Sequence, residues 1–380
     1  MSDRVFVFLE IFAREGGIQS YVKDVFQAYS SIANAQSETA EIFLLRDQQD
    51  CLNPYANEKL QFHYFQNASA SRGRINLAIA LLQCLLLRRP CHVYCGHIKL
   101  APLVKLLCQP LGIPYTVLTY GKEVWETLPK SEQKALQQAN SIWTISRYSR
   151  DRLTAANNIS KEQVAILPCI VDETEFTPGD KSPQLLHKYG LTDAKVLMTV
   201  ARLWSGDIYK GVDVTIRALP QILQVFSDVK YLVIGRGDDQ PRLKALAEKL
   251  GVSDRVIFAG FVANAELADH YRLADAYIMP SQEGFGIVYL EAMACGKPVL
   301  AGDDDGSADP LQDGLLGWQV PHRNVDAVAQ ACIEILQKSD LGVSIQKQDP
   351  RCNSEWLREA TLAKFSQQAL QQQLQKLLII

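Results

Sequence analysis

The chain lacks the excess of basic residues that a general nucleic-acid binder needs. Across 380 residues, 39 lysines and arginines stand against 42 aspartates and glutamates, which leaves a formal net charge of −3. This balance argues against broad electrostatic attraction to nucleic acid, although it does not exclude a local basic face. The chain is also too long for one ordinary hydrophobic core, so its length predicts two domains.

A disulfide framework is absent as well. The nine cysteines are an odd number, scattered from Cys51 to Cys352 without framework spacing. This usage indicates reduced thiols in a cytoplasmic protein. Cys91, Cys95 and His97 are close enough in sequence to suggest metal ligands, but no second ligand pair with zinc-type spacing follows. We therefore favour a strand and its exit here, and expect no metal.

No apolar run reaches the length of a membrane span. The longest, from Ile75 to Leu87, is shorter than the roughly 20 residues that a bilayer requires. Two interpretations stay open, a core helix with polar ends and a helix that contacts an anionic membrane surface. The second interpretation draws on the flanking basic residues, which are Arg72, Arg74, Arg88 and Arg89.

Strand-like apolar runs alternate with helical patterns through both halves of the chain, which predicts two parallel-sheet α/β domains. Strands are predicted at residues 4–9, 40–45, 61–65, 92–94, 115–119, 141–144 and 164–166, and again at 195–200, 230–234, 256–259, 276–279 and 298–301. Helices are predicted at 17–31, 75–87, 101–107, 131–138 and 147–156, and again at 211–226, 241–250, 266–274, 287–294 and 325–336.

A segment rich in proline and acidic residues, 168–183, separates the two series and predicts a hinge. We expect an N-terminal domain over residues 1–170 and a C-terminal domain over 171–354. In two-domain α/β enzymes the ligand usually binds in the cleft between the halves. The remaining tail, to residue 380, is predicted to be helical.

The stretch from Pro280 to Pro298 is the most informative in the chain. It places Glu283 and Glu291 on either side of a glycine-containing loop that runs into a helix. A strand, a tight loop and a helix form a ligand-binding crossing in open α/β proteins, and the helix start offers backbone amides to an anion. Carboxylates accept hydrogen bonds from diols, so the segment predicts a nucleotide-sugar site. Its loop and helix start comprise Gly284, Phe285, Gly286, Ile287 and Val288.

Two basic residues that precede this stretch in the sequence are candidates for the same site. Arg202 follows one predicted strand, and Lys210 precedes the next helix. Together they could neutralise the charge that builds on a leaving diphosphate. Downstream, Asp303, Asp304 and Asp305 suggest a metal, but a solvated loop or an acceptor contact is the favoured interpretation.

Three glycine-containing turns give weaker signals. Gly16 and Gly17 open the first helix and could present amides to phosphate. Gly235 begins an incomplete dinucleotide fingerprint in which Gln240 takes the place of the third glycine. We interpret it as a turn near the nucleotide and not as a nicotinamide site. Val262 follows a further strand end.

The Glu283–Glu291 segment resembles the donor-site motif of retaining GT-B glycosyltransferases, in particular family 4, the glycosyl transferases group 1. The resemblance covers most of the chain. It implies two Rossmann-like, doubly wound domains that face a central cleft, with a C-terminal helix at about 355–380 packing back on the first domain. It also implies that the nucleotide base is contacted near Val262, largely through the backbone.

The resemblance assigns roles to several of these residues. Arg202 and Lys210 would stabilise the leaving diphosphate, with amides near Gly17 and Gly286, while Glu283 would hold sugar hydroxyls and Glu291 the ribose diol. One departure is Tyr120, since many relatives carry histidine at this position. His97 ends a predicted strand and could face the cleft, although a lone histidine is more often structural.

The implied reaction is retaining, metal-independent transfer of a hexose from a nucleotide diphosphate-sugar to a hydroxyl, without a cofactor. UDP-glucose is the expected donor, with GDP-mannose second. The expected acceptor is a polysaccharide or a lipid-linked sugar, with peripheral contact at the inner face of the membrane. Two other functions stay open: a non-catalytic nucleotide-sugar binding subunit, and an NAD-dependent oxidoreductase.

Overall fold

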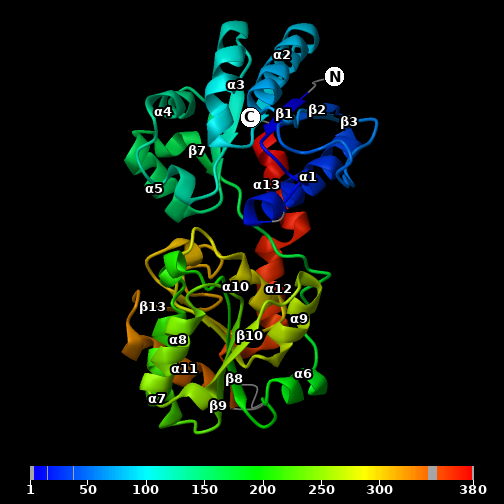
Figure 1. Ribbon diagram of the computed structural model, residues 1–380. Helices are drawn as coiled ribbons and strands as arrows, with labels where there is room; N and C mark the ends of the chain where they lie inside the picture. Colours follow the sequence, from blue (N-terminus) through cyan, green and yellow to red (C-terminus); the bar gives the residue numbers. More distant parts are fainter. Residues whose placement is uncertain (1–3, 15, 37, 341–348, 379–380) are drawn as a thin grey trace. The chain divides into compact units, whose positions relative to one another are not determined.

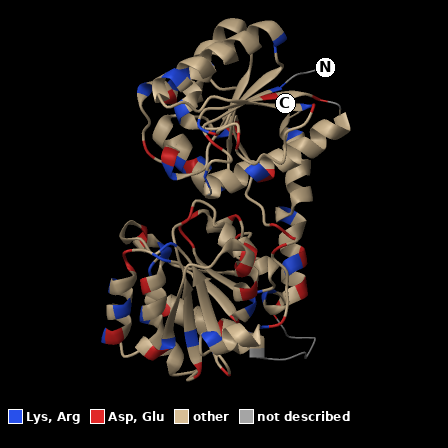
Figure 2. Ribbon diagram, turned by 45° about the vertical axis from the view of Figure 1, so that its right-hand side comes forward, with Lys and Arg blue, Asp and Glu red and all other residues tan. Residues whose placement is uncertain are grey.

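The computed structural model describes residues 4–14, 16–36, 38–340 and 349–378 (Figure 1). The chain divides into two compact units, the first comprising Met1–Ile170 with Gln367–Ile380 and the second Val171–Ser366. Each unit is built on one parallel sheet with helices packed on it. Figure 2 shows basic and acidic residues interspersed over both units, with neither sign gathered on one side.

The first unit holds seven strands in the order β3-β2-β1-β4-β5-β6-β7. They are β1 (Arg4–Phe8), β2 (Ala40–Leu44), β3 (Leu60–Tyr64), β4 (His92–Cys95), β5 (Tyr115–Leu118), β6 (Ser141–Thr144) and β7 (Val164–Ile166). All five residues of β1 are buried, as expected for a parallel strand that is covered on both faces. The strand order reverses between β1 and β4, which is where ligands bind in open α/β sheets.

The second unit holds six strands in the order β10-β9-β8-β11-β12-β13. They are β8 (Lys195–Val200), β9 (Val229–Ile234), β10 (Val256–Gly260), β11 (Ala276–Met279), β12 (Val299–Gly302) and β13 (Trp318–Val320). Here the order reverses between β8 and β11. All twelve predicted strands form, with ends shifted by one residue at most. The three-residue strand β13 was not predicted.

All ten helices predicted between residues 17 and 336 form, and α6 is an addition next to the predicted hinge. The helices are α1 (Gly17–Gln36), α2 (Ala70–Arg88), α3 (Ala101–Cys108), α4 (Lys130–Gln137), α5 (Arg147–Asn157), α6 (Pro183–Lys188), α7 (Val212–Leu223), α8 (Gln240–Lys249), α9 (Asn264–Leu273), α10 (Ile287–Ala294), α11 (Val325–Asp340), α12 (Ser354–Phe365) and α13 (Gln367–Leu378).

The predicted tail helix at about 355–380 forms as two helices that belong to different units, and its last two residues lie outside the described ones. The helix breaks at Ser366, whose backbone is extended. α12 belongs to the second unit, where Arg358 donates hydrogen bonds to the carbonyls of Ala294 (2.7 Å) and Glu173 (2.8 Å). α13 belongs to the first unit, where the Gln373 amide donates to the Ile166 carbonyl at 2.6 Å.

Helix α2 has two apolar faces, and only one of them is covered. Gly73, Leu77, Leu81 and Leu85 are buried. The opposite face exposes Ile75, Ile79, Leu82 and Leu86. Because both faces are apolar, α2 is long and apolar enough by length and composition to cross a membrane, a test that core helices also pass. The interpretation as an ordinary core helix, and the expectation that this run is too short to span, therefore need correction.

The two faces of α2 should respond differently to truncation. Leu81→Ala should lower the free energy of unfolding by about 2–5 kcal/mol, because it opens a cavity against the first sheet. Ile79→Ala, on the exposed face of the same helix, should change it by less than about 1 kcal/mol. Urea unfolding followed by far-UV circular dichroism measures both. Equal losses would contradict the assignment of the two faces.

Candidate active site

The site that the sequence predicts forms at the strand reversal of the second unit. The loop after β8 and the loop after β11 meet there, and the Gln282 amide donates to the Tyr209 carbonyl at 3.1 Å. Gly211 has a φ of 77°, and a Cβ at this position would lie 2.4 Å from the Pro280 carbonyl oxygen. Only glycine lets the two loops approach this closely.

This contact brings Lys210 and Glu283 together. The Lys210 ammonium forms an ion pair with the Glu283 carboxylate, and their side chains are 20% and 15% exposed. Two residues predicted from distant parts of the sequence therefore form one partly buried charged pair. Such a pair can contact an anion through its lysine and hydroxyl groups through its glutamate.

A third loop, after β12, supports the glutamate from behind. The buried Asp305 carboxylate accepts hydrogen bonds from the amides of Glu283 (2.6 Å) and Ser307 (2.8 Å). The Gly306 amide donates to the Glu283 carbonyl at 2.7 Å. Burial raises the pKa of Asp305 to about 6. The interpretation of 303–305 as a solvated loop is therefore wrong for Asp305, which positions Glu283, although Asp303 and Asp304 are exposed.

Helix α10 begins directly beside this pair. Gly286 holds its N-terminal cap in the left-handed region, with a φ of 93°, and no side chain caps the helix. Phe285 is buried and packs edge-on against Phe365, with the ring centroids 5.9 Å apart. Over the residues that the structure describes, the Ile287 and Val288 amides have no hydrogen-bond acceptor. They are suited to an anion.

Arg202 is engaged elsewhere in its own loop. Its Nε donates to the buried Asp207 carboxylate at 2.6 Å, and its guanidinium lies 5.3 Å from the centre of the Trp204 ring. Burial alone would raise the pKa of Asp207, but hydrogen bonds from Arg202 and Tyr209 outweigh it and lower the pKa. The Arg202 side chain is 66% exposed. The structure thus gives Arg202 a partner that the sequence did not predict.

Glu291 lies one turn into α10 and is paired with a tyrosine from α9. The buried Tyr271 hydroxyl donates to its carboxylate at 2.6 Å. Burial raises the pKa of Glu291 to about 7, against the opposing effect of the Tyr271 hydrogen bond. Tyr271 had no signal in the sequence, because its partner is 20 residues away on another helix.

Comparison with known proteins identifies the family. The sequence model of "Glycosyl transferases group 1" matches residues 194–338. A protein of Corynebacterium glutamicum is 30% identical over 85% of this chain and 86% of its own length. The chain belongs to the group 1 glycosyltransferases. The Corynebacterium relative is named a GDP-mannose-dependent monoacylated alpha-(1-6)-phosphatidylinositol monomannoside mannosyltransferase.

A second relative is more similar but aligns over less of its length. The GDP-mannose-dependent alpha-(1-6)-phosphatidylinositol monomannoside mannosyltransferase of Mycolicibacterium smegmatis is 35% identical over 57% of this chain, and this chain spans 59% of that relative. Among solved structures, a glycosyltransferase from Rickettsia africae has a TM-score of 0.74 at 17% identity, covering 99% of this chain and 97% of its own. Anabaena HepE in complex with UDP has a TM-score of 0.72 at 18% identity, covering 100% and 99%. These structures show that the chain has the GT-B fold.

The glycines of the incomplete dinucleotide pattern are needed for backbone packing. Gly235 has a φ of 135°, and a Cβ there would lie 1.8 Å from the Ala201 carbonyl oxygen. A Cβ at Gly237 would lie equally close to the Leu203 carbonyl oxygen. Both glycines let β9 end against the loop after β8. By contrast, an added Cβ on Gly17 meets nothing within 4 Å, so packing does not require glycine there.

The remaining sequence candidates divide between core and surface. Val262 is buried, while its neighbour Phe261 is 64% exposed with the Arg236 guanidinium 4.8 Å from its ring centre. In the first unit, Tyr120 is buried and donates to the Gly96 carbonyl at 2.7 Å, so it is a core residue. An added Cβ on Gly16 would meet only the Gln19 side chain, at 2.8 Å.

His97 lines a pocket of about 150 Å³ at the reversal between β1 and β4. Its Nδ1 accepts from the Lys99 amide at 3.1 Å, so the neutral ring carries its proton on Nε2. Burial lowers the pKa of His97 to about 4. No group of three His, Cys, Asp or Glu side chains suited to a metal occurs in the described part of the chain, so the cysteine–histidine metal alternative finds no support.

Replacing Gly235 tests whether this pattern is structural. Gly235→Ala should cost at least about 2 kcal/mol of unfolding free energy, because the new methyl group meets backbone and the φ disfavours alanine. Gly17→Ala is the matched control and should be nearly neutral. Urea unfolding measures both, and a Gly235→Ala protein as stable as wild type would refute the packing role.

Glu291 should make stability depend on pH. Its folded-state pKa of about 7 lies above the ordinary value, so its stabilisation is complete below about pH 4.5 and is lost as the pH rises through 7. Relative to Glu291→Gln, the wild type should lose up to about 3 kcal/mol between pH 4.5 and pH 8. Urea midpoints at several pH values measure this difference. Glu359→Gln, an exposed change on α12, is the control, and a flat profile at Glu291 would contradict the burial effect.

Proposed function

We propose that this chain transfers a mannosyl group from GDP-mannose to a hydroxyl of a lipid-linked saccharide, with retention and without a bound metal. The observation that carries the proposal is the Lys210–Glu283 ion pair beside the N-terminus of α10. It combines a cation, backbone amides and a carboxylate at the strand reversal of one sheet. A nucleotide diphosphate-sugar presents the complementary diphosphate and hydroxyl groups.

The mechanism follows from this combination. The Lys210 ammonium and the Ile287 and Val288 amides stabilise the negative charge that grows on the leaving diphosphate. Glu283 accepts hydrogen bonds from sugar hydroxyls and orients the donor. The bond from the anomeric carbon to phosphate breaks while the bond to the acceptor oxygen forms on the same face. The acceptor proton passes to the leaving phosphate oxygen.

Glu291 is assigned to the ribose diol and Arg202 to a secondary role. The Glu291 carboxylate shares one oxygen with Tyr271, which leaves capacity to accept from a hydroxyl. Arg202 would contribute to diphosphate binding only after leaving Asp207. The sequence assigned Arg202 and Lys210 jointly to the leaving diphosphate, and the Arg202–Asp207 contact is the reason for giving Arg202 the lesser role.

The choice of donor differs from the expectation drawn from the sequence. UDP-glucose ranked first there on family frequency alone. The relatives from Mycolicibacterium and Corynebacterium are both named GDP-mannose-dependent, at 35% and 30% identity. The UDP complex of Anabaena HepE is only 18% identical. The relatives therefore favour GDP-mannose.

The proposed location is the inner face of a membrane, with the protein bound peripherally. The exposed apolar face of α2 can enter the headgroup region, while its buried face remains on the sheet. Both relatives act on phosphatidylinositol mannosides by name, which fits a lipid-linked acceptor. The buried face of α2 packs on the sheet of the first unit. We therefore propose that α2 lies on the membrane and does not cross it.

Calorimetric titration with GDP, UDP and, as a control, NAD, all in EDTA, followed by turnover of GDP-mannose, tests the proposal. We expect micromolar GDP binding without metal, at least tenfold weaker UDP binding, and a turnover in Lys210→Met lowered about 100-fold or more. Lys249→Met, on the exposed face of α8, should match wild type.

Each alternative has its own signature in this experiment. Tighter binding of UDP would keep the enzyme class and overturn the donor. GDP binding with neither donor hydrolysis nor transfer would indicate a non-catalytic subunit. Binding of NAD alone would refute the glycosyltransferase proposal.

A further inference from the structure

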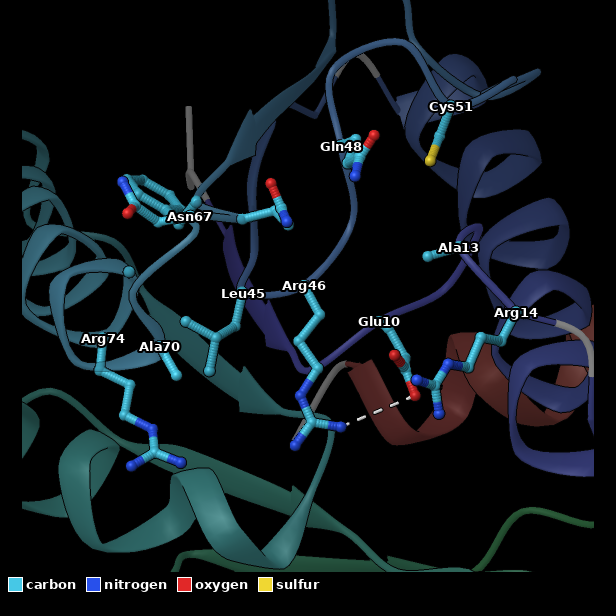
Figure 3. A pocket seen from close by; sticks show the side chains of 13 residues that line it. Glu10, Ala13, Arg14, Leu45, Arg46, Gln48, Cys51, Asn67, Ala70 and Arg74 are labelled. Carbon is cyan, nitrogen blue, oxygen red and sulfur yellow. Dashed lines mark ion pairs between the residues drawn. The ribbon is translucent and has the colours of Figure 1, made fainter.

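The first unit holds a pocket of about 470 Å³ to which no role has yet been given. It lies at the carboxyl ends of β1, β2 and β3, and the first turn of α2 closes one side (Figure 3). Three arginines line it, Arg14, Arg46 and Arg74, with Glu10 as the single acidic residue. The lining therefore carries a formal charge of +2, in a chain whose net charge is negative.

The arginines of this pocket have N–H groups that are available to bind a ligand. The closest ion pair is a loose one, with Arg46 Nη1 3.8 Å from Glu10 Oε1. Figure 3 shows the Arg14 and Arg46 guanidinium groups directed toward the Glu10 carboxylate from opposite sides. Over the described residues, neither Arg14 nor Arg74 has an ion pair or a side-chain hydrogen bond. Elsewhere, Arg4 and Arg88 each have a carboxylate within 3.0 Å.

The backbone around the pocket is fixed by buried contacts. The fully buried Asp47 carboxylate accepts from the amides of Ile11 (2.6 Å), Phe12 (2.8 Å) and Ala13 (2.6 Å). These bonds hold the loop that carries Glu10 and Arg14. A Cβ on Gly73 would lie 2.7 Å from the Phe65 carbonyl oxygen, so α2 starts in close contact with the end of β3. Arg74 is placed by that contact.

The other residues that line the pocket indicate which chemical groups its ligand should carry. Amide side chains of Gln48 and Asn67 border the pocket, so it offers hydrogen-bond partners to hydroxyls as well as charge to an anion. Glu10 and Arg46 also line the neighbouring pocket that contains His97, at the reversal between β1 and β4. An anionic group held by the arginines would thus leave its attached polyol next to the position where α/β sheets bind substrates.

We infer that this pocket binds the phosphate ester of the acceptor, with Arg14, Arg46 and Arg74 on the phosphate and Glu10 on adjacent hydroxyls. The inference rests on the proposed function, since it names the chemistry of the acceptor for the same reaction. Guanidinium groups match phosphate oxygens in geometry and charge. The phosphate can belong to a membrane lipid, because α2 leads from the pocket into the exposed apolar face, or to a soluble polyol phosphate.

Binding of two phosphate esters to the full chain tests the inference. The probes are inositol 1-phosphate, by calorimetry, and phosphatidylcholine vesicles with 20% phosphatidylinositol, by sedimentation. Arg46→Gln and Arg74→Gln should each weaken binding at least tenfold, because each removes a charged hydrogen-bonding partner. Arg152→Gln is the matched control, since Arg152 is exposed on α5 of the same unit and does not line the pocket. It should weaken binding less than twofold.

The two probes separate the possible sources of the phosphate. Losses with both probes would assign the pocket to the phosphate ester whatever its source, and losses with vesicles alone would assign it to a lipid headgroup. Equal losses in Arg152→Gln and Arg46→Gln would show that the effect comes from general surface charge, and would overturn the inference. So would unchanged binding of both probes in Arg46→Gln and Arg74→Gln.

GDP binding, measured on the same proteins, separates this inference from the proposed function. It should stay within twofold of wild type in all three variants, which also shows that they are folded. If wild type binds no GDP, the proposed function fails while the phosphate assays still decide the pocket. If GDP binds and mannosyl transfer occurs, but wild type binds neither phosphate probe, the pocket assignment alone fails.

Discussion

The close approach of two backbone loops at the reversal of the second sheet is the constraint on which the site depends. Gly211 against the Pro280 carbonyl, and the Gln282 amide on the Tyr209 carbonyl, fix the loops after β8 and β11 to each other. Lys210 and Glu283 then have to meet, because each is next to one of these contacts. Asp305 adds a third strand end to the same arrangement. The charged pair is thus held by backbone contacts on both sides.

Backbone contacts also position the charged side chains of the first unit. Asp47 fixes a loop through three amides, and Gly73 fixes the start of α2, so the arginine pocket is built on anchored backbone. Flexible side chains supply the charge there, and rigid backbone supplies their spacing. Sites of this kind lose less conformational entropy on binding than sites on free loops.

Sequence patterns predicted what is local or continuous. Buried parallel strands are short apolar runs, so twelve of the thirteen could be located, and the Glu283–Glu291 segment indicated the donor site because its chemistry is contiguous. Contacts between distant residues left no such signal. The Asp47 carboxylate accepts hydrogen bonds from amides 34 to 36 residues earlier in the chain. The Asp305 carboxylate accepts one from the Glu283 amide, 22 residues earlier. Likewise, a helix with apolar residues on opposite faces, such as α2, does not reveal which of its faces is covered.

The split tail has a consequence for the order of folding. Because α13 belongs to the first unit and α12 to the second, the second unit is an insertion within the first. Its residues are contiguous, so it can complete its core once Ser366 has been synthesised. The first unit begins earlier in synthesis, but its helix α1 is covered by α13 only after the second unit has been made. The buried residues of α13 are Leu370, Leu374 and Leu378. The first unit is therefore completed after the second, contrary to the usual N-terminal-first order.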